Sequence, residues 1–353
     1  MSIPIVQKSW KIVRKGKPSA ALFFDKKAAV PSQLKPGEVL IQVKAAALNP
    51  VGYKLMQMLP NILSGGRPYP AEHDLSGVIV DIHKDTKTEL KVGDSDTKTE
   101  LKVGDSVFGY IEVELQRKTQ QGAITQYTRM PASCLAPLPP TVSFTEAAGF
   151  TLAGQTAWQG LFQVGKVEPG QTILVNGGSS SVGGFAIQMA KAKGCKVVAT
   201  ASSKNEEYFI DYTAGPLHQA LITNPPSPKF HVIFDAVGLS DSSLYKHSRL
   251  YLAPNGCYVS VSPNELNAQA LGLLFHGYLR PRWLGGVPAA FRTVFVRHSK
   301  DDLYAIRDLI AEGKLKPTVD SVFALEDTLK AYERIMSHRA RGKVVIRVDP
   351  DAE

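Results

Sequence analysis

The stretch from residue 172 to residue 204 constrains the fold of this chain more than any other part of the sequence. It contains an apolar run TILVN, a turn of small residues GGSSSVGG, an amphipathic segment FAIQMAKAKG and a second apolar run KVVATA. Such near-continuous apolar runs, separated by helical patterns, are typical of parallel strands that are covered on both faces. Two later runs, HVIFDAV and CYVSV, have the same character. We therefore predict a doubly wound α/β domain with a parallel sheet.

The small residues between the first strand and the helix predict a phosphate-binding turn. A backbone that approaches a pyrophosphate closely cannot carry large side chains, and the amides at a helix N-terminus attract negative charge. The GxGxxG pattern is incomplete, because Ser180 stands where a glycine is expected, and a tight turn without a ligand is the alternative. The residues assigned to the cofactor are Gly177, Gly178, Ser180, Ser181, Val182 and Gly183.

The end of the second strand indicates which dinucleotide is bound. An Asp or Glu at this place binds a ribose 2′-hydroxyl group, whereas basic and hydroxyl groups accept a 2′-phosphate. The sequence of residues 201–204 is ASSK, and no acid appears before Glu206. We therefore predict NADPH as the cofactor, although Lys204 could instead be a solvated surface lysine. The residues expected near the 2′-phosphate are Ser202, Ser203, Lys204 and Tyr212.

The connection that follows, from Ala201 to Ile210, is short for a crossover between parallel strands, which normally takes a dozen or more residues. We expect either a helix reduced to a turn or a remodelled edge of the sheet. In either case Lys204 and Tyr212 would not reach the phosphate together, and cofactor affinity would suffer.

The first part of the chain has a different pattern. Short β-rich runs such as EVLIQVKAAAL, SGVIVDI and SVFGYIEV alternate with turn signals, which predicts a compact β-barrel. The proline-rich segment at 136–142 breaks regular structure and marks a boundary. We expect a barrel domain formed by residues 1–139 and closed by residues 315–353, with the α/β domain at residues 140–314.

An in-frame tandem duplication lies inside the predicted barrel. The sequence DTKTELKVGDS occupies residues 85–95 and again residues 96–106, and only the second copy runs into VFGY. We expect the first copy to be extruded as a surface loop without a functional role, since the entropy of closing a loop grows slowly with its length.

The composition excludes several classes of protein. The chain has 353 residues, of which 44% are hydrophobic and 21% charged, so it is globular and long enough for two domains. No apolar run approaches the roughly 20 residues of a membrane span, and the start lacks a secretory pattern, so we expect a cytoplasmic protein. The net charge of +9 comes from scattered Lys and Arg, which fits a polyanionic cofactor better than nucleic acid. The widely spaced cysteines, expected to be buried thiols, are Cys134, Cys195 and Cys257.

Several motifs occur in the order of a known family. They are ALNPVGYK at 47–54, GDSVFG before GAITQY, EAAGFTLAGQTAW, DAVG, and RARGKVVI near the end. Together they resemble the quinone oxidoreductase-like branch of the medium-chain dehydrogenases/reductases, over nearly the whole chain. The resemblance implies a GroES-like barrel domain, a Rossmann domain and a substrate cleft between them.

The resemblance also implies roles for single residues. Asn49, Tyr53 and Lys54 would line the nicotinamide end of the cleft, and Thr156 would contact the nicotinamide. Tyr53 and Lys54 are the expected donors to the substrate oxygen, with His73 as a further candidate for returning a proton, a task that solvent could also perform. Tyr53 could instead simply pack, Lys54 could be solvated, and His73 could be a loop residue.

The same comparison bears on the local turn and on metal binding. The family commonly has an aspartate where this chain has Gly52, which leaves the hydrogen bonds of that turn open. In the zinc branch a cysteine ligand would fall at Asn49 and a His-Glu pair at His73-Asp74, so that only the histidine is kept in this chain. A catalytic zinc takes three protein ligands and a water, and we therefore expect no metal.

These observations favour an NADPH-dependent reductase that transfers hydride to a quinone or an α,β-unsaturated carbonyl. An enoyl-thioester reductase is an alternative, because GLLFHGYLRPRWLGG, with Arg280, Arg282 and Trp283, could supply an apolar channel and a basic entrance. A non-catalytic NADPH-binding protein is a third possibility. Residues 271–275 and RTVFVRH are consistent with the edge of a homodimer, although they could also be buried within one subunit.

Overall fold

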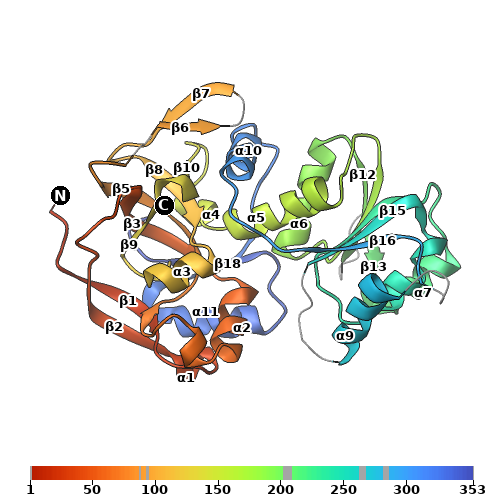
Figure 1. Cartoon of the computed structure of the whole chain (residues 1–353), viewed down its shortest axis with the longest axis horizontal. Coiled ribbons are helices and arrows are strands. Elements are labelled where there is room, and N and C mark those ends of the chain that lie inside the picture. The colour runs from red at the N-terminus through yellow and green to blue at the C-terminus, as the bar shows by residue number, and fades with distance from the viewer. Residues whose placement is uncertain are drawn as a thin grey trace. The chain divides into compact units, whose positions relative to one another are not determined.

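The computed structural model describes residues 2–86, 89–92, 95–201, 209–261, 268–280 and 286–352, with the backbone alone at residues 89–92, 95–100, 209 and 212. The chain forms two compact units (Figure 1). Unit 1 consists of Met1–Leu152, Arg297–Gly313 and Pro317–Glu353, and unit 2 of Ala153–Val296 and Lys314–Lys316.

The division differs from the expected boundaries at residues 140–152 and 297–313, which belong to unit 1, and at residues 315–316, which belong to unit 2. The larger of these differences is the segment 297–313. Helix α10 (Lys300–Ala311) packs against strand β10 (Leu135–Pro137) with Leu303, Ile306 and other apolar side chains buried. Just before the helix, the His298 N–H donates to Glu112 Oε1 at 3.0 Å. These long-range contacts hold the segment in unit 1, and the local sequence pattern does not contain them.

Unit 2 contains a six-stranded sheet in which every strand is parallel to its neighbours, as predicted. The order across the sheet is β13-β12-β11-β14-β15-β16, which is the 3-2-1-4-5-6 order of doubly wound dinucleotide-binding domains. The strands are β11 (Thr172–Asn176), β12 (Lys196–Ala201), β13 (Phe209–Asp211), β14 (Phe230–Asp235), β15 (Leu252–Val261) and β16 (Ala290–Val294).

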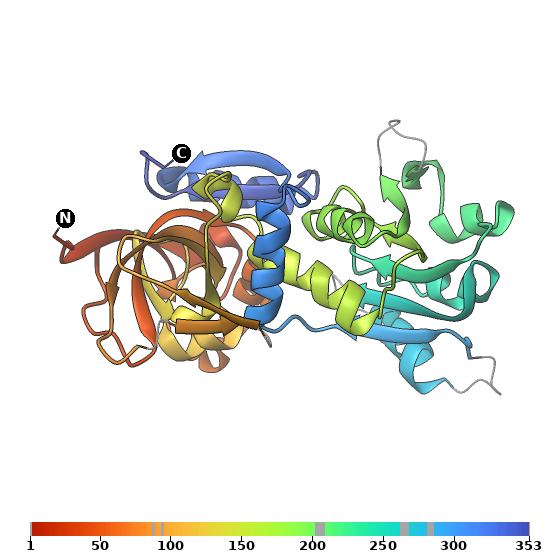
Figure 2. The same ribbon diagram turned by 90° about the horizontal axis from the view of Figure 1, so that it is seen from above.

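The helices of unit 2 follow from the apolar spacing of their sequences. In α6 (Ser181–Ala192) the residues Phe185, Ala186, Met189 and Ala190 recur at the three- and four-residue spacing of one helical face, and this face packs on β11 and β12. Figure 2 shows α6 and the sheet from a second direction. The other α-helices are α5 (Thr151–Trp158), α7 (Leu217–Thr223), α8 (Ser243–Lys246) and α9 (Ala268–Leu274). The described residues of the unit also include the π-helical segments η3 (Gln159–Val164) and η6 (Phe275–Leu279), and the 3₁₀ turns η4 (Tyr212–Ala214) and η5 (Ser248–Leu250).

The short crossover ends in a parallel edge strand. Strand β13 pairs with β12 so that Phe209 lies opposite Ala199 and Asp211 lies opposite Ala201. The edge strand thus has only three residues, each paired with β12. The predicted phosphate ligands Ser202, Ser203 and Lys204 lie in this connection, outside the described residues.

Unit 1 is built on an antiparallel sheet with a parallel pair at one end. The order is β10-β8-β5-β3-β18-β17, strand β9 also pairs with β3, and a smaller sheet has the order β2-β1-β4. The strands are β1 (Val6–Ile12), β2 (Leu22–Ala29), β3 (Glu38–Ala47), β4 (Tyr69–Pro70), β5 (Asp74–Ile82), β8 (Ser106–Tyr110), β9 (Tyr127–Pro131), β17 (Val319–Ala324) and β18 (Lys343–Arg347). The helices besides α10 are α1 (Pro18–Ala21), α2 (Pro50–Met58), α3 (Val113–Thr119), α4 (Phe144–Ala147) and α11 (Thr328–Met336).

The C-terminal tail closes this unit. Strand β18 pairs antiparallel to β3, with Val345 opposite Ala47 and Ile346 opposite Ala46. Side chains of β3, β5, β18 and α11 form one apolar core, which includes Val43, Leu75 and Val344. This pairing brings the start of β18 close to the C-terminal end of β3, and these two ends carry the polar residues considered below.

The duplicated segment forms a hairpin of its own. Strands β6 (Glu89–Val92) and β7 (Ser95–Glu100) pair with each other and form a separate two-stranded sheet beside the barrel strands (Figure 1). The expected loop is thus a hairpin. The second copy of the sequence continues into the barrel, where Leu101 is buried and the Ile79 N–H donates to the carbonyl oxygen of Asp105 at 3.0 Å.

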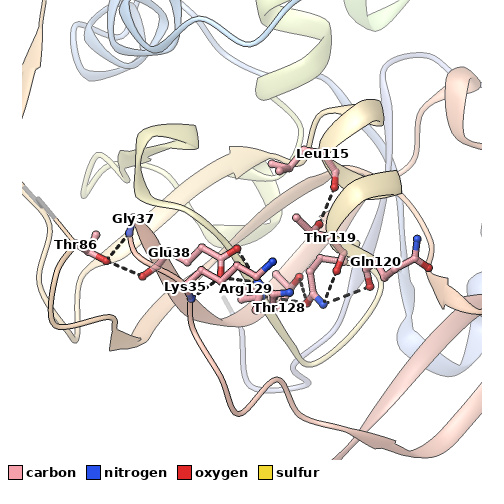
Figure 3. A network of polar contacts seen from close by, with 10 residues as sticks. Lys35, Gly37, Glu38, Thr86, Leu115, Thr119, Gln120, Thr128 and Arg129 are labelled. Atoms are coloured by element: carbon pink, nitrogen blue, oxygen red, sulfur yellow. Dashed lines mark hydrogen bonds and ion pairs between the residues drawn. The ribbon is translucent and has the colours of Figure 1, made fainter. Parts of the chain in front are cut away.

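Polar contacts hold the barrel where the insertion begins (Figure 3). The Thr86 hydroxyl donates to the carbonyl oxygen of Glu38 and accepts the Gly37 N–H, both at 3.1 Å. The Glu38 carboxylate in turn accepts Arg129 Nη1 at 2.7 and 2.5 Å. The chain therefore enters and leaves the hairpin at fixed positions, which explains how the barrel tolerates the second copy of the eleven-residue segment.

Deletion of residues 96–106 should change the stability of the protein very little. The shortened chain keeps Thr86 and one complete copy of LKVGDS before VFGY, and doubling the length of a loop costs only about 0.6 kcal/mol. We expect the free energy of unfolding, measured with urea, to change by less than about 1 kcal/mol. A loss several times larger would show that the hairpin contributes to the core.

Two further expectations can be compared with the structure. The three cysteines are free and buried, as predicted. Within the described ranges, no helix is both long enough and apolar enough to cross a lipid bilayer.

Candidate active site

The glycines of the turn after β11 are packed closely against the rest of unit 2. Gly177 has a φ of 86°, a conformation that favours glycine. A Cβ atom at Gly183 would lie 2.1 Å from the carbonyl oxygen of Gly177, so helix α6 begins in direct backbone contact with the turn. At Gly178 a Cβ atom would lie 3.0 Å from the Ala199 side chain. The three glycines therefore allow the strand, the turn and the helix start to pack together tightly.

Ser180 begins this helix and explains why the glycine pattern is incomplete. Its φ of −75° and ψ of 159° are ordinary for a residue with a side chain. Its hydroxyl oxygen accepts the Gly183 N–H at 3.0 Å and donates to the carbonyl oxygen of Gly177 at 2.8 Å. Ser181 and Val182 follow as the first helical residues, whose amides have no acceptor within the helix. The positive end of the helix dipole and these amides fit a pyrophosphate.

A chain of hydrogen bonds between buried polar side chains of the sheet fixes the same turn. The Thr200 hydroxyl accepts the Gly177 N–H at 2.8 Å and donates to Asn176 Oδ1 at 2.8 Å. Asn176 Nδ2 then donates to Asp235 Oδ1 at 2.9 Å. Burial raises the pKa of Asp235, although its oxygen also accepts the Leu239 N–H at 2.8 Å. Because these residues end adjacent strands, the carboxyl edge of the sheet is tied together under the turn.

The other predicted residues of unit 2 are only partly described. Thr156 lies on α5 and is buried. Tyr212 begins the turn η4, and its side chain is outside the described part of the chain. Among the described residues, those that could hold a dinucleotide are therefore the glycine turn and the first residues of α6.

Unit 1 contains a buried cluster of polar residues that joins three distant segments. Lys343 Nζ, at the start of β18, donates to Asp74 Oδ2 at 2.9 Å and to Asn49 Oδ1 at 2.8 Å. Asn49 Nδ2 donates to the same Asp74 oxygen at 3.0 Å. The other Asp74 oxygen accepts the Leu152 N–H at 2.9 Å. The Lys343 and Asp74 side chains are 3% and 0% exposed, so each charge depends on the other.

Glu72 is a second buried carboxyl group beside this cluster. Its Oε2 accepts the Asn49 N–H at 3.1 Å, and its Oε1 accepts the Tyr332 hydroxyl at 2.7 Å. Burial raises the pKa of Glu72 to about 8, against the opposing effects of these hydrogen bonds. The charge of Lys343 is already balanced by Asp74, so an ionised Glu72 would lack a partner. At neutral pH the carboxyl group is mainly protonated.

The predicted catalytic residues of unit 1 lie in this neighbourhood. Tyr53 is buried on α2, and burial raises its pKa. Lys54 is the next residue of α2 and is half-buried. His73 is buried, and its Nδ1 lies 2.8 Å from the carbonyl oxygen of Ile111. Because a carbonyl only accepts, Nδ1 carries a proton in this hydrogen bond, and burial lowers the pKa of His73.

Asn49 and Asp74, which stand at positions of zinc ligands in the zinc branch, are hydrogen-bonded to each other and to Lys343. Asn49 and Asp74 share the ammonium group of Lys343, which supplies the positive charge between their oxygens. In the part of the chain that the structure describes, no three His, Cys, Asp or Glu side chains lie together as metal ligands do.

Comparisons with known proteins assign the family. The alcohol dehydrogenase GroES-like domain model matches residues 35–140, and the zinc-binding dehydrogenase model matches residues 206–346. The chain is 30% identical to a zinc-type alcohol dehydrogenase-like protein of Schizosaccharomyces pombe, over 97% of this chain and 96% of that protein. It belongs to the medium-chain dehydrogenase/reductase family.

Other members of the family support the quinone oxidoreductase-like branch. The trans-enoyl reductase poxH of Penicillium oxalicum is 30% identical over 99% of this chain and 100% of its own length. The 2-methylene-furan-3-one reductase of Solanum lycopersicum is 30% identical over 99% of this chain and 81% of its own length. The solved quinone oxidoreductase of Coxiella burnetii has the same fold, with a TM-score of 0.76 at 22% identity, over 97% of this chain and 99% of that structure. This medium-chain reductase is therefore an oxidoreductase with a nicotinamide-binding fold.

Sequence reasoning missed several polar residues that the structure of this medium-chain reductase brings together. Lys343 was visible in the sequence as a charged residue at the start of an otherwise apolar strand, and Asp74 likewise precedes an apolar strand. Glu72 and Tyr332 gave no signal in sequence, since they lie 260 residues apart along the chain. In unit 2 the signal was clearer, because Asn176, Thr200 and Asp235 lie at or next to the last residues of the apolar strands β11, β12 and β14.

Proposed function

We propose that this medium-chain reductase uses NADPH to reduce a quinone or an α,β-unsaturated carbonyl compound, without zinc. The observation that carries the proposal is the glycine turn, because it leads directly into the start of helix α6 at the carboxyl edge of a parallel sheet, where helix amides bind phosphate. When bound, the dinucleotide would supply a hydride from C4 of its nicotinamide.

The residues of the chain have three tasks in this proposal. The amides at the start of α6 bind the pyrophosphate, and Thr156 orients the nicotinamide. Tyr53 and Lys54 donate hydrogen bonds to the substrate oxygen, on which negative charge develops. Asn49 is held by Asp74 and Lys343, so we assign it the task of fixing the start of α2 rather than of moving during the reaction.

The preference for NADPH rests on the sequence at 202–204. Two hydroxyl groups and a lysine can hold a 2′-phosphate, and no acid is present there to bind a free ribose hydroxyl. The absence of zinc chemistry is supported by Lys343, whose ammonium group already satisfies the oxygens of Asn49 and Asp74.

An enoyl-thioester reductase is the second candidate, because relatives of this chain include trans-enoyl reductases. The predicted basic entrance does not support it. Arg280 Nη1 lies 3.3 Å from His276 Nδ1, beside a hollow that Asn255 and Ala290 also line. Asn255 and Ala290 lie near the amino ends of β15 and β16, whereas the glycine turn follows the carboxyl end of β11. Arg282 and Trp283 lie outside the described residues.

The test is the oxidation of NADPH, followed at 340 nm, with a panel of quinones, enones and crotonyl-type thioesters. We expect turnover with quinones or enones and a higher kcat/KM with NADPH than with NADH. Higher kcat/KM on the thioesters would favour the second candidate. Saturable NADPH binding without turnover on any member of the panel would instead indicate a non-catalytic cofactor-binding protein.

A further inference from the structure

Residue 52, in the first turn of α2, has no room for a side chain. A Cβ atom built on Gly52 would lie 2.0 Å from Oε1 and 2.6 Å from Cδ of Glu72. The φ of Gly52 lies outside the left-handed region, so the backbone itself would accept another residue. The carboxyl group of Glu72 therefore fills the volume that a residue-52 side chain would need.

In many helices an acidic side chain stands at the third helical position, which is the position of Gly52 here. Helix α2 begins after its N-cap residue Asn49, so Gly52 is its third helical residue. In a capping box, the acid at that third position reaches back to the N–H of the N-cap residue. Here no acidic residue lies in the first turn, and the Asn49 N–H donates to Glu72 Oε2 at 3.1 Å instead. A distant residue makes the contact that the helix lacks.

Glu72 is held in place at a cost in free energy. Its φ is 63°, in the left-handed region that residues with side chains rarely adopt, and it is 1% exposed. The Tyr332 hydroxyl on α11 holds its Oε1, and Gln116 Nε2 on α3 donates to its carbonyl oxygen at 3.1 Å. Surroundings that fix a strained, buried acid at one helix start indicate that this start must be held in one geometry.

We propose that Glu72 is a positioning residue for the first turn of α2, where it replaces the missing acid of a capping box. It acts through Asn49 and through the turn that carries Tyr53 and Lys54. The structural part of the proposal is independent of the reaction, and the catalytic part rests on the proposed function.

The experiment moves the carboxyl group from residue 72 to residue 52. An aspartate at residue 52 would bring its carboxyl group into the volume that the Glu72 carboxyl group occupies, and a glycine at residue 72 would relieve the positive φ. The variants are Gly52→Asp, Glu72→Gly and the double variant. The matched control is Glu146→Ala, because Glu146 closes a capping box with Ser143 at the start of another helix, α4.

The first measurement is the free energy of unfolding. We expect each single variant to be destabilised, Gly52→Asp by collision with Glu72 and Glu72→Gly by loss of its contacts, and the double variant to recover most of the loss. Losses that simply add in the double variant would overturn the proposal. This measurement needs no substrate, so it decides the structural part even if the protein turns over nothing.

The second measurement separates positioning from stability. In the folded enzyme we expect kcat to fall by roughly tenfold in each single variant and to recover in the double variant, with the dissociation constant for NADPH unchanged. The Glu146→Ala control should lose stability and keep its kcat. If the stability pattern holds but kcat of Glu72→Gly equals that of the parent enzyme, the positioning role is wrong, while turnover by the parent enzyme leaves the proposed function standing.

Discussion

Gly183→Ala is expected to weaken NADPH binding by about 100-fold, because the turn has to move by more than about 1 Å to admit one methyl group. The Cβ atom would lie 2.1 Å from the Gly177 carbonyl oxygen and 2.8 Å from its carbonyl carbon, and both atoms are backbone. A backbone contact cannot be relieved by rotating a side chain. The affinity is measured by titrating purified protein with NADPH and following the fluorescence of the nicotinamide.

The neighbouring glycine provides a matched control. A Cβ atom at Gly184 would lie 3.7 Å from the carbonyl oxygen of Gly178, which is an ordinary van der Waals contact. Gly184→Ala should therefore bind NADPH like the parent protein, and its helix should gain stability, since alanine is favoured over glycine inside a helix. Equal affinity of both variants would mean that the turn after β11 does not hold the dinucleotide.

Lys343→Met is expected to destabilise unit 1 by about 3–5 kcal/mol, since it leaves Asp74 charged and buried without a partner. Both side chains are almost fully buried, and Lys343 Nζ is 2.9 Å from Asp74 Oδ2. The same substitution removes the donor to Asn49 Oδ1. The change is measured as the free energy of unfolding in urea.

Two variants show whether the buried charge is the cause. Lys343→Met combined with Asp74→Asn removes both charges and should recover a large part of the loss. Lys118→Met breaks an ion pair with Glu114 whose side chains are 71% and 68% exposed, and it should cost less than about 1 kcal/mol. A loss for Lys343→Met as small as that for Lys118→Met would contradict the role given to the buried pair.

The two polar clusters contribute to the proposed reaction in different ways. In unit 2, Thr200, Asn176 and Asp235 fix the turn whose backbone amides we propose to bind the cofactor phosphates. These side chains support the proposed binding surface without forming it. In unit 1, Glu72 and Lys343 hold the segment from Asn49 to Lys54, which carries the proposed donors. Both clusters stabilise a geometry, and neither supplies a nucleophile, as expected for hydride transfer.

The sequence by itself determined the parallel sheet of unit 2, the turn from Gly177 to Gly183 and the start of α6. These features depend on residues that are close along the chain, and apolar periodicity and small side chains report such local structure directly. The departure at Ser180 was explained only by the structure, in which its side chain caps the start of α6.

Only the tertiary structure decided the polar core of unit 1. Lys343 reaches Asp74 across 269 residues of sequence, and Tyr332 reaches Glu72 across 260. No local pattern records such pairs, because they form only after β18 has paired with β3 and α11 has packed on the barrel. The same reason explains Gly52, which looked like a missing aspartate in sequence and is, in the folded chain, the space that the Glu72 carboxyl group fills.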